Sequence, residues 1–245
     1  MERNLQKAKI LGCRVDVIDM PAALSFVDSA IKKGKPSQII TLNAEMIYRA
    51  QYETELCSIY ANADLVTPDG IGTIWALKRA GYPNVQRVTG IDLTQRIMEE
   101  GNTQKWSVYL FGGRPGVASE LKIRLEKDYP LLKVVGTDNG YFTEKEEETI
   151  IARIQKAKPQ ILLVALGAPK QEYWIAKYLD TIKVPVCIGI GGTFDVLAGF
   201  SKRAPRIWRN MGLEWLYRLL REPSRLERQL ALPRFAFMVL RDKKN

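Results

Sequence analysis

Short apolar runs alternate with longer amphipathic segments along most of this chain, and this alternation limits the possible folds more than any other feature. The apolar runs have the length of β-strands, whereas the segments between them repeat apolar residues at helical spacing. Strands that alternate with helices of this length need crossover connections, which place neighbouring strands parallel. The sequence therefore predicts an α/β fold: a Rossmann-like, mostly parallel sheet with helices on both faces.

The expected elements follow from these runs. Strands are predicted at residues 14–18, 38–42, 65–68, 107–111, 133–136, 161–166 and 186–190. Helices are predicted at residues 22–33, 44–61, 73–80, 116–127 and 145–156. The last of these opens with Thr143 and Glu146 at the spacing of a capping box.

The end of the chain differs from the rest in charge. Residues 201–245 hold 12 Lys and Arg against 4 Asp and Glu, a net charge of +8, which leaves only +2 for residues 1–200. Leucines in this tail form an apolar helical stripe, and arginines recur at steps of three and four. We therefore expect two domains, an α/β body at 1–200 and a basic amphipathic helical appendage at 201–245.

A basic amphipathic appendage of this kind is typical of an element that lies on an anionic membrane surface. Aromatic residues stand among its arginines, so stacking on nucleic-acid bases is a second interpretation. The membrane interpretation is preferred, and no nucleic-acid partner is expected. The alternative without a binding function is a solvated basic surface.

The chain has no histidine, which removes the usual general base and the commonest zinc ligand. Proton transfer must therefore fall to Asp, Glu, Lys, Tyr or Cys. Three separated cysteines predict neither a disulfide framework nor a metal cluster, and they fit a reducing cytosol. The first ten residues lack the apolar core of a signal peptide, and no apolar run approaches the roughly 20 residues that span a bilayer.

Polar, glycine-containing stretches follow several of the predicted strands. Ligands of a parallel sheet bind at the carboxyl ends of its strands, where glycines and helix N-termini favour phosphate. A phosphate-bearing ligand is therefore expected, although neither a G-x-G-x-x-G fingerprint nor a Walker A loop is present. No Asp-x-Asp pair is available to hold a diphosphate through a divalent cation. The stretches are TLNAE (41–45), TPDGIG (67–72), FGGRPG (111–116), LGAPKQE (166–172) and GIGGTFD (189–195).

A longer set of motifs occurs in one order along the chain. They are TLNAE, TPDG, RVTGIDL, DNGYF, ALGAPKQE, GIGGTFDVLAG followed by KRAP, and GLEWLYRLLREPSR. With these motifs the chain, from about residue 13 to its end, resembles the WecG/TagA/CpsF family of bacterial glycosyltransferases, glycosyltransferase family 26. Composition and periodicity alone reach only an α/β phosphate binder with a basic amphipathic tail.

The resemblance implies an inverting, metal-independent transfer of N-acetylmannosamine from its UDP donor to N-acetylglucosamine on undecaprenyl diphosphate. The reaction would take place at the inner face of the cell membrane, without a cofactor, and in the teichoic-acid branch it begins a linkage unit. In another branch the donor is the corresponding uronic acid, and that alternative stays open, as does a homo-oligomeric state. A Rossmann oxidoreductase and a nucleic-acid-binding module are the alternatives from other classes.

The resemblance also assigns roles to individual residues. Asp69 matches the proposed general base of the family, and Thr41 is the second residue expected at the catalytic centre. Each has a structural alternative. Asp69 precedes a predicted helix and could cap it, and Thr41 could take part in capping the helix predicted at 44–61. Substrate-binding roles follow for Asn43, Arg87, Gln171 and Asp195, whose alternatives are helix caps or exposed polar residues. Contacts with the lipid diphosphate and the membrane are expected from Arg218, Arg225 and Arg228, and no residue is expected to bind a metal.

Overall fold

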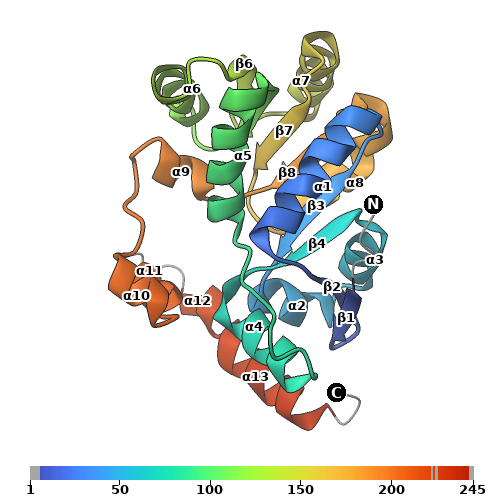
Figure 1. Ribbon diagram of the computed structural model, residues 1–245, viewed down its shortest axis with the longest axis vertical. Coiled ribbons are helices and arrows are strands. Elements are labelled where there is room, and N and C mark those ends of the chain that lie inside the picture. The colour runs from blue at the N-terminus through green and yellow to red at the C-terminus, as the bar shows by residue number, and fades with distance from the viewer. Residues whose placement is uncertain (1–5, 222, 224–225, 243–245) are drawn as a thin grey trace.

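The computed structural model describes residues 6–221, 223 and 226–242, and its centre is a six-stranded parallel sheet (Figure 1). The strand order is β4–β3–β8–β7–β5–β6, and every neighbouring pair is parallel. The predicted α/β class with a mostly parallel sheet is therefore confirmed. The strands are β3 (Gln38–Leu42), β4 (Leu65–Pro68), β5 (Ser107–Gly112), β6 (Lys133–Asp138), β7 (Ile161–Ala165) and β8 (Val186–Gly189).

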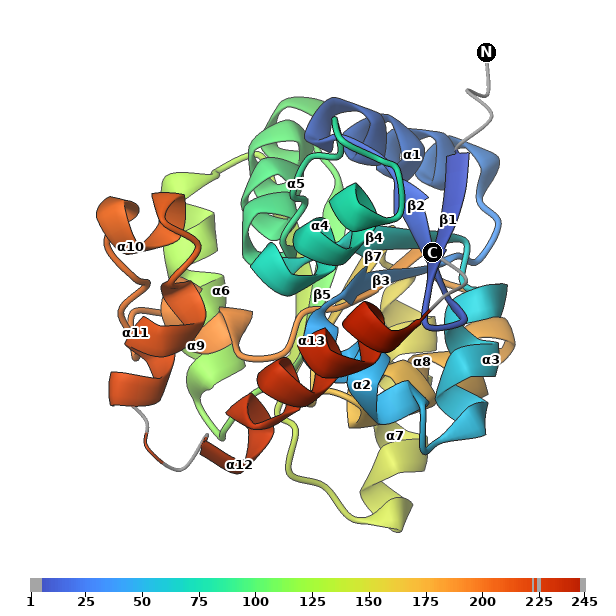
Figure 2. The ribbon, with the colours of Figure 1, turned by 90° about the horizontal axis from the view of Figure 1, so that it is seen from below.

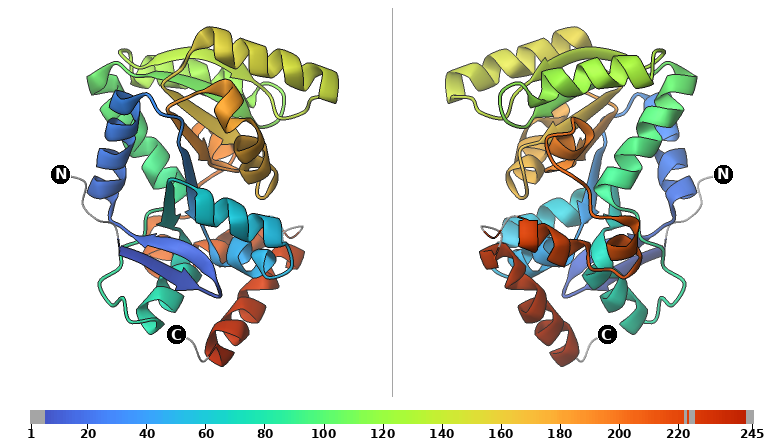
Figure 3. Two further views of the ribbon diagram at one scale, coloured as in Figure 1. Left: turned by 90° about the vertical axis from the view of Figure 1, so that its right-hand side faces the viewer. Right: turned by 90° about the vertical axis from the view of Figure 1, so that its left-hand side faces the viewer.

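Helices cover both faces of this sheet because successive strand side chains point to opposite sides. Ile39 and Leu65 belong to the core beneath one helix layer, whereas the adjacent Ile40 and Val66 belong to the core on the other face. Figure 3 shows the two layers on either side of the strands. One layer contains α1 (Met20–Lys33), α5 (Gly90–Gln104) and α6 (Val117–Asp128); the other contains α3 (Thr54–Asn62), α7 (Glu144–Ala157) and α8 (Lys170–Ile182).

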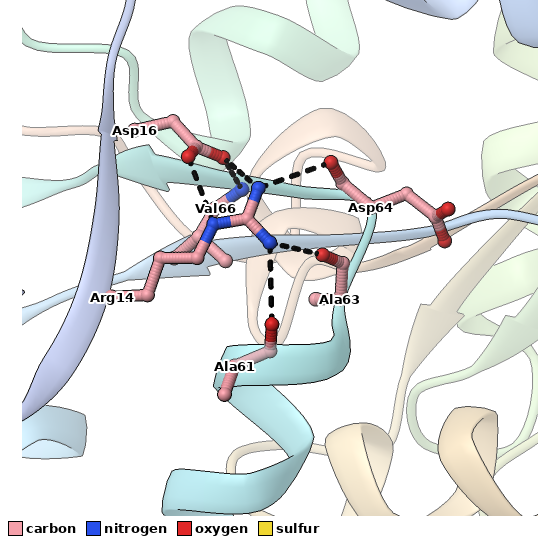
Figure 4. Close-up of polar contacts among 6 residues, drawn as sticks. All are labelled: Arg14, Asp16, Ala61, Ala63, Asp64 and Val66. Atoms are coloured by element: carbon pink, nitrogen blue, oxygen red, sulfur yellow. Dashed lines mark hydrogen bonds and ion pairs between the residues drawn. The ribbon is translucent and has the colours of Figure 1, made fainter. Parts of the chain in front are cut away.

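An antiparallel hairpin, β1 (Gln6–Ile10) and β2 (Cys13–Val17), covers the open edge of the sheet at β4. The fully buried Asp16 carboxylate accepts a hydrogen bond from the Val66 amide at 2.8 Å and pairs with Arg14 at 2.8 Å (Figure 4). The Arg14 guanidinium also donates to the backbone carbonyls where α3 ends, those of Ala61, Ala63 and Asp64. This network fixes the edge strand whose carboxyl end carries Asp69.

Several helices begin at the carboxyl edge of the sheet. They include α2 (Ala44–Ala50), α4 (Gly70–Arg79) and α9 (Thr193–Leu197). The helix predicted at 44–61 is divided into α2 and α3, and α4 begins three residues before its predicted start. The division is stabilised by tertiary contact, because the Gln51 side-chain amide donates to the Leu11 carbonyl at 2.9 Å.

The basic tail forms α10 (Arg206–Asn210), α11 (Glu214–Arg221), α12 (Leu226–Gln229) and α13 (Ala231–Arg241). Figures 1 and 2 place α13 beside α4 and α2, where Phe235 and Val239 are buried in the core. The domain boundary at residue 201 stays a prediction, but α13 packs as part of the body. Among the described residues, no helix combines the length and the apolar character that a membrane crossing needs.

Candidate active site

Two cavities adjoin at the carboxyl edge of the sheet. The larger, a cleft of about 1030 Å³ that we call the large cleft, is lined by the loops after β5, β6, β7 and β8. Strand β5 leads to β6 in one direction along the sheet, whereas its neighbour β7 leads to β8 in the other. This reversal is a topological switch point, the place where open α/β sheets bind their ligands.

The large cleft carries both charge and aromatic surface. Arg114 and Asp195 form an ion pair across it at 3.0 Å, between the loop before α6 and the short helix α9. Lys170 and Lys177 on α8 also line it, as does the well-exposed ring of Tyr141 from the DNGYF motif. Cations beside an exposed aromatic ring suit a ligand that has both phosphate and a planar base.

The second cavity, of about 280 Å³, lies beside the large cleft and is called the Asp69 pocket here. The two cavities share Gly167, Gly191 and Gly192. Tail residues complete its wall, including Gly212, Trp215 and Arg228. The structure therefore brings six of the predicted residues to one pocket and places Asp195 in the neighbouring cleft. The six are Thr41, Asn43, Asp69, Arg87, Gln171 and Arg228.

Asp69 occupies the residue before α4, but its side chain makes no capping hydrogen bond to that helix. Its Oδ2 instead accepts a hydrogen bond from the backbone amide of Gly90, the first residue of α5, at 3.1 Å. The Asp69 amide donates to the Leu42 carbonyl at 3.0 Å, which ties its backbone to the end of β3. The carboxylate is thus held at a helix N-terminus that favours negative charge.

Thr41 and Asn43 come from the end of β3, beside Asp69. Asn43 caps α2, because its side-chain oxygen accepts from the Met46 amide at 3.0 Å. Thr41 is buried, and a Cβ added at Gly90 would lie only 3.1 Å from its hydroxyl oxygen. The start of α5 therefore fits closely against both Thr41 and Asp69, and only a glycine leaves that space open.

Gln171 is buried at the start of α8, and its side-chain Oε1 accepts a hydrogen bond from the Gly191 backbone amide at 2.9 Å. Its amide nitrogen donates to the neighbouring Glu172 carboxyl at 2.8 Å. Gln171 thereby fixes the Gly191 loop that both cavities share. A Cβ at Gly189 would lie 2.7 Å from the Gln171 amide nitrogen, so a glycine is needed there for the two elements to approach.

Glu172 points away from solvent and is almost completely buried. Burial raises the pKa of its carboxyl to about 7, although the hydrogen bond from Gln171 opposes that rise. Its Oε2 has no hydrogen-bond partner within the described part of the chain, and the same holds for the buried Tyr60 hydroxyl. Glu172 is therefore a buried carboxyl group held beside Gln171.

The remaining predicted residues are arginines. Arg87 lines the Asp69 pocket from the loop before α5. Arg228 on α12 also lines it, and its Nε lies 2.8 Å from Glu45 Oε1. Arg218 lies in α11, but its side chain is outside the described part of the structure, and Arg225 lies outside the described residues altogether.

Sequence reasoning did not assign a role to Glu45, Gly90 or Trp215, which the structure places at the Asp69 pocket. Glu45 and Gly90 lie inside motifs that were singled out, TLNAE and RVTGIDL. The spacing of Thr89 and Asp92 resembles a capping signal and could have identified the start of α5. No sequence signal pairs Glu45 with Arg228, because the two are 183 positions apart.

No group of three or more Cys, Asp or Glu side chains that could hold a metal ion occurs among the residues that the structure describes. Cationic side chains line both cavities, such as Arg87 in the Asp69 pocket and Lys170 in the large cleft. These groups can neutralise the charge of a bound phosphate.

Two cavities thus adjoin at this edge of the sheet, one lined by cations and an exposed aromatic ring and the other containing a positioned carboxylate. The family model described as "Glycosyl transferase WecG/TagA/CpsF family" matches residues 8–245 of the chain. The match covers almost the whole sequence, so the protein belongs to the WecG/TagA/CpsF family of glycosyltransferases. The resemblance of its motifs to this family is confirmed. In general terms, enzymes of this family transfer a sugar from a nucleotide-sugar donor to a lipid-linked acceptor.

Proposed function

We propose that this enzyme transfers N-acetylmannosamine from UDP-N-acetylmannosamine to the 4-hydroxyl of N-acetylglucosamine on undecaprenyl diphosphate, with inversion. One observation carries the proposal. Thr41, Asn43, Asp69, Arg87 and Gln171 converge on one pocket, and that pocket shares the Gly191 loop with a cleft suited to a nucleotide. A donor that lies across the shared loop would present its sugar to Asp69.

The proposed chemistry needs one base and one leaving group. Asp69 takes the proton from the acceptor hydroxyl while the oxygen of that hydroxyl attacks the anomeric carbon of the donor. The bond from this carbon to the diphosphate breaks, and UDP departs into the large cleft. Inversion requires attack opposite the leaving group, and a base in one cavity with the nucleotide in the next suits that geometry.

Asp195 is proposed to accept hydrogen bonds from the ribose hydroxyls of the donor, because it lines the large cleft together with Arg114. Lys170 and Arg114 are suited to the diphosphate, and the Tyr141 ring is suited to stacking on the base. No bound metal is assigned a role in this proposal. Cationic side chains and backbone amides stabilise the negative charge that develops on the diphosphate as it leaves.

The charges of the Asp69 pocket favour a neutral donor sugar over its uronic acid. Its described charged side chains are three carboxylates, Glu45, Asp69 and Glu214, and two guanidinium groups, Arg87 and Arg228. The guanidinium of Arg228 is already paired with Glu45. A sugar carboxylate would therefore enter a pocket in which negative charge is in excess, which is unfavourable at low dielectric.

The tail supports an acceptor that is carried on a membrane. Ile207, Met211 and Leu220 expose apolar side chains, and the region has a net charge of +8. Exposed apolar groups among arginines favour an anionic membrane surface. We therefore place the enzyme on the inner face of the cell membrane, where its lipid-linked acceptor would lie.

The test is a transfer assay in the presence of EDTA, with UDP-N-acetylmannosamine, its uronic acid, and lipid-linked N-acetylglucosamine. The wild type should be active with the neutral donor, and Asp69→Asn should lose at least about 100-fold in kcat. Asp128→Asn is the matched control, since this exposed aspartate lies on α6, outside both cavities. Undiminished Asp69→Asn activity would remove the base assignment, and preference for the uronic acid would replace the donor.

A further inference from the structure

The position of the Asp69 carboxylate depends on the segment that leads into α5. The Val88 amide donates to the Pro68 carbonyl at 3.0 Å, and the Thr67 hydroxyl donates to the Val88 carbonyl at 3.1 Å. Two residues further along, the Gly90 amide donates to Asp69 Oδ2. Residues 88–90 thus run alongside the end of β4, and any shift of this segment would move the partner of the carboxylate.

The start of α5 is fixed by a reciprocal pair of hydrogen bonds. The Thr89 hydroxyl accepts from the Asp92 amide at 3.2 Å and donates to Asp92 Oδ2 at 2.6 Å. Burial alone would raise the pKa of Asp92, but the hydrogen bond from Thr89 and the charge of Arg203 outweigh it and lower that pKa. The Asp92 carboxylate is therefore ionised in the folded protein, and it needs a cation nearby.

Arg203 is that cation, and it comes from the KRAP motif between α9 and α10. Its Nη2 lies 2.7 Å from Asp92 Oδ1, and its Nη1 lies 3.4 Å from Gln95 Oε1. The Arg203 side chain is only 15% exposed. The Asp92 side chain is 35% exposed, so the pair is partly buried, and removal of one partner leaves the other charge only partly compensated by solvent. This pair therefore constrains where the first turn of α5 lies.

We propose that Arg203 and Asp92 are positioning residues for sugar transfer, because through Thr89 and Gly90 they hold the Asp69 carboxylate toward its pocket. The inference rests on the proposed function, in which Asp69 is the base. It gives a shared role to the KRAP motif and to the part of RVTGIDL that follows the substrate-binding Arg87. It also joins the base to the segment from which the basic tail begins.

Movement of the α5 start would disturb two catalytic positions together. A Cβ at Gly90 would already press on the Thr41 hydroxyl, so this turn has little room to shift toward β3. A displacement away from β3 would lengthen the hydrogen bond between Gly90 and Asp69. A misplacement of about 1 Å at a reacting group can lower a rate by about 100-fold. The nucleotide cleft does not include Thr89, Asp92 or Arg203, so binding of UDP should not change.

The test compares Arg203→Ala, Arg203→Lys and Asp92→Asn with the wild type and with Asp69→Asn. We expect Arg203→Ala and Asp92→Asn to lower kcat by about 10- to 100-fold, with Kd for UDP and KM for the donor changed less than about 3-fold. The acid limb of the kcat profile should move to higher pH, since the Gly90 amide would no longer favour the ionised base. Arg203→Lys should recover part of the rate.

The control is Arg96→Ala, which removes an exposed ion pair from the same helix, 2.6 Å to Glu99, and should change neither rate nor profile. Thermal unfolding of every variant checks the fold, and Asp92→Asn decides the matter if Arg203→Ala does not fold. Wild-type kcat and profile in folded Asp92→Asn, with Asp69→Asn inactive, would overturn this inference and leave the proposed function standing. An active Asp69→Asn would overturn both.

Discussion

Helix α13 and the three helices before it belong to one basic tail, but they meet the body of the protein in opposite ways. Phe235 and Val239 of α13 are 1% and 0% exposed and lie in the core with α2 and α4. Ile207 and Leu220, on α10 and α11, are 71% and 66% exposed. The same composition of arginine, leucine and aromatic residues thus builds a core helix in one half and an apolar surface in the other.

This difference teaches that amphipathic character does not say what an apolar stripe packs against. The α13 stripe packs on protein because α2 and α4 approach each other closely there, where a Cβ at Gly72 would lie 2.9 Å from that of Ala44. The described residues of α10–α12 lie between Arg203 at one end and α13 at the other, and Arg228 of α12 also pairs with Glu45 of the body. Their exposed apolar side chains remain available to a membrane, which is the function proposed for them.

The largest expected effect tests the core half of the comparison. Phe235→Ala should lower the free energy of unfolding by about 3–5 kcal/mol, because it leaves a cavity among α13, α2 and α4. Urea unfolding measures the change. Phe237→Ala is the control, since this side chain is on the same helix and 55% exposed, and should change stability by less than about 0.5 kcal/mol. Equal effects of the two substitutions would mean that α13 is not part of the core.

A second prediction concerns Glu172, which is buried beside Gln171 and so differs most from the exposed side chains of the tail helices. The folded pKa of Glu172, about 7, lies above its ordinary value of 4.5, so the folded state holds a proton that the unfolded state releases in that interval. Stability should therefore fall as pH rises from about 4.5 to 7, by about 3 kcal/mol in total.

Glu172→Gln cannot ionise and should flatten this part of the pH–stability curve. Urea unfolding at pH 5 and pH 8 gives the comparison, with the exposed Glu148→Gln on α7 as the control. The advantage of Glu172→Gln over the wild type should be larger at pH 8. An identical pH dependence in both proteins would mean that Glu172 is ionised in the folded state throughout.

Sequence patterns predicted the strands well because their apolar runs are buried on both faces of a parallel sheet. They missed β1, α5 and α8. In α5, the buried Gly101 interrupts the helical pattern where Leu132 packs against it. They also could not divide residues 44–61, because the contact of Gln51 with Leu11 is tertiary. Local propensity carries no information about such contacts.

The candidate site follows the same rule. The motifs predicted which residues gather at the carboxyl edge, since strand ends meet there in any parallel sheet. They left open whether Asp69 caps α4, and the structure shows its side chain bound to Gly90 of α5 instead. The motifs also did not indicate that Asp195 lies in the large cleft and not in the Asp69 pocket, because that placement depends on the order of the strands in the sheet.

A third prediction tests the exposed half of the tail. Ile207→Ser, Met211→Ser and Leu220→Ser combined should weaken binding to anionic lipid vesicles by at least about 10-fold, because each side chain contributes apolar area at the membrane. Stability in urea should change by less than about 0.5 kcal/mol, since all three are exposed. The control combines Ile123→Ser and Leu131→Ser, exposed apolar positions on α6 and the loop after it. An equal loss of vesicle binding in the control would contradict a specific surface on α10–α12.

The smallest expected effect concerns the ion pair between α12 and the body, Arg228 to Glu45. This pair joins α12 to the body, and both of its residues line the Asp69 pocket. Arg228 is 48% exposed, so solvent and salt screen the interaction. A double-mutant cycle with Arg228→Ala and Glu45→Ala should give a coupling of about 0.2–1 kcal/mol in the free energy of unfolding.

The local pair of Arg49 on α2 and Glu53 is the matched control, because it spans four residues and both partners belong to the body. Both pairs should show a similarly small coupling in stability and a similar loss at high salt. Arg228→Ala should raise KM for the lipid-linked acceptor and Arg49→Ala should not, since Arg228 lines the pocket and Arg49 does not. A coupling above about 2 kcal/mol for Arg228 and Glu45 would mean that α12 is held as firmly as α13, and that the two halves of the tail do not differ in the way proposed.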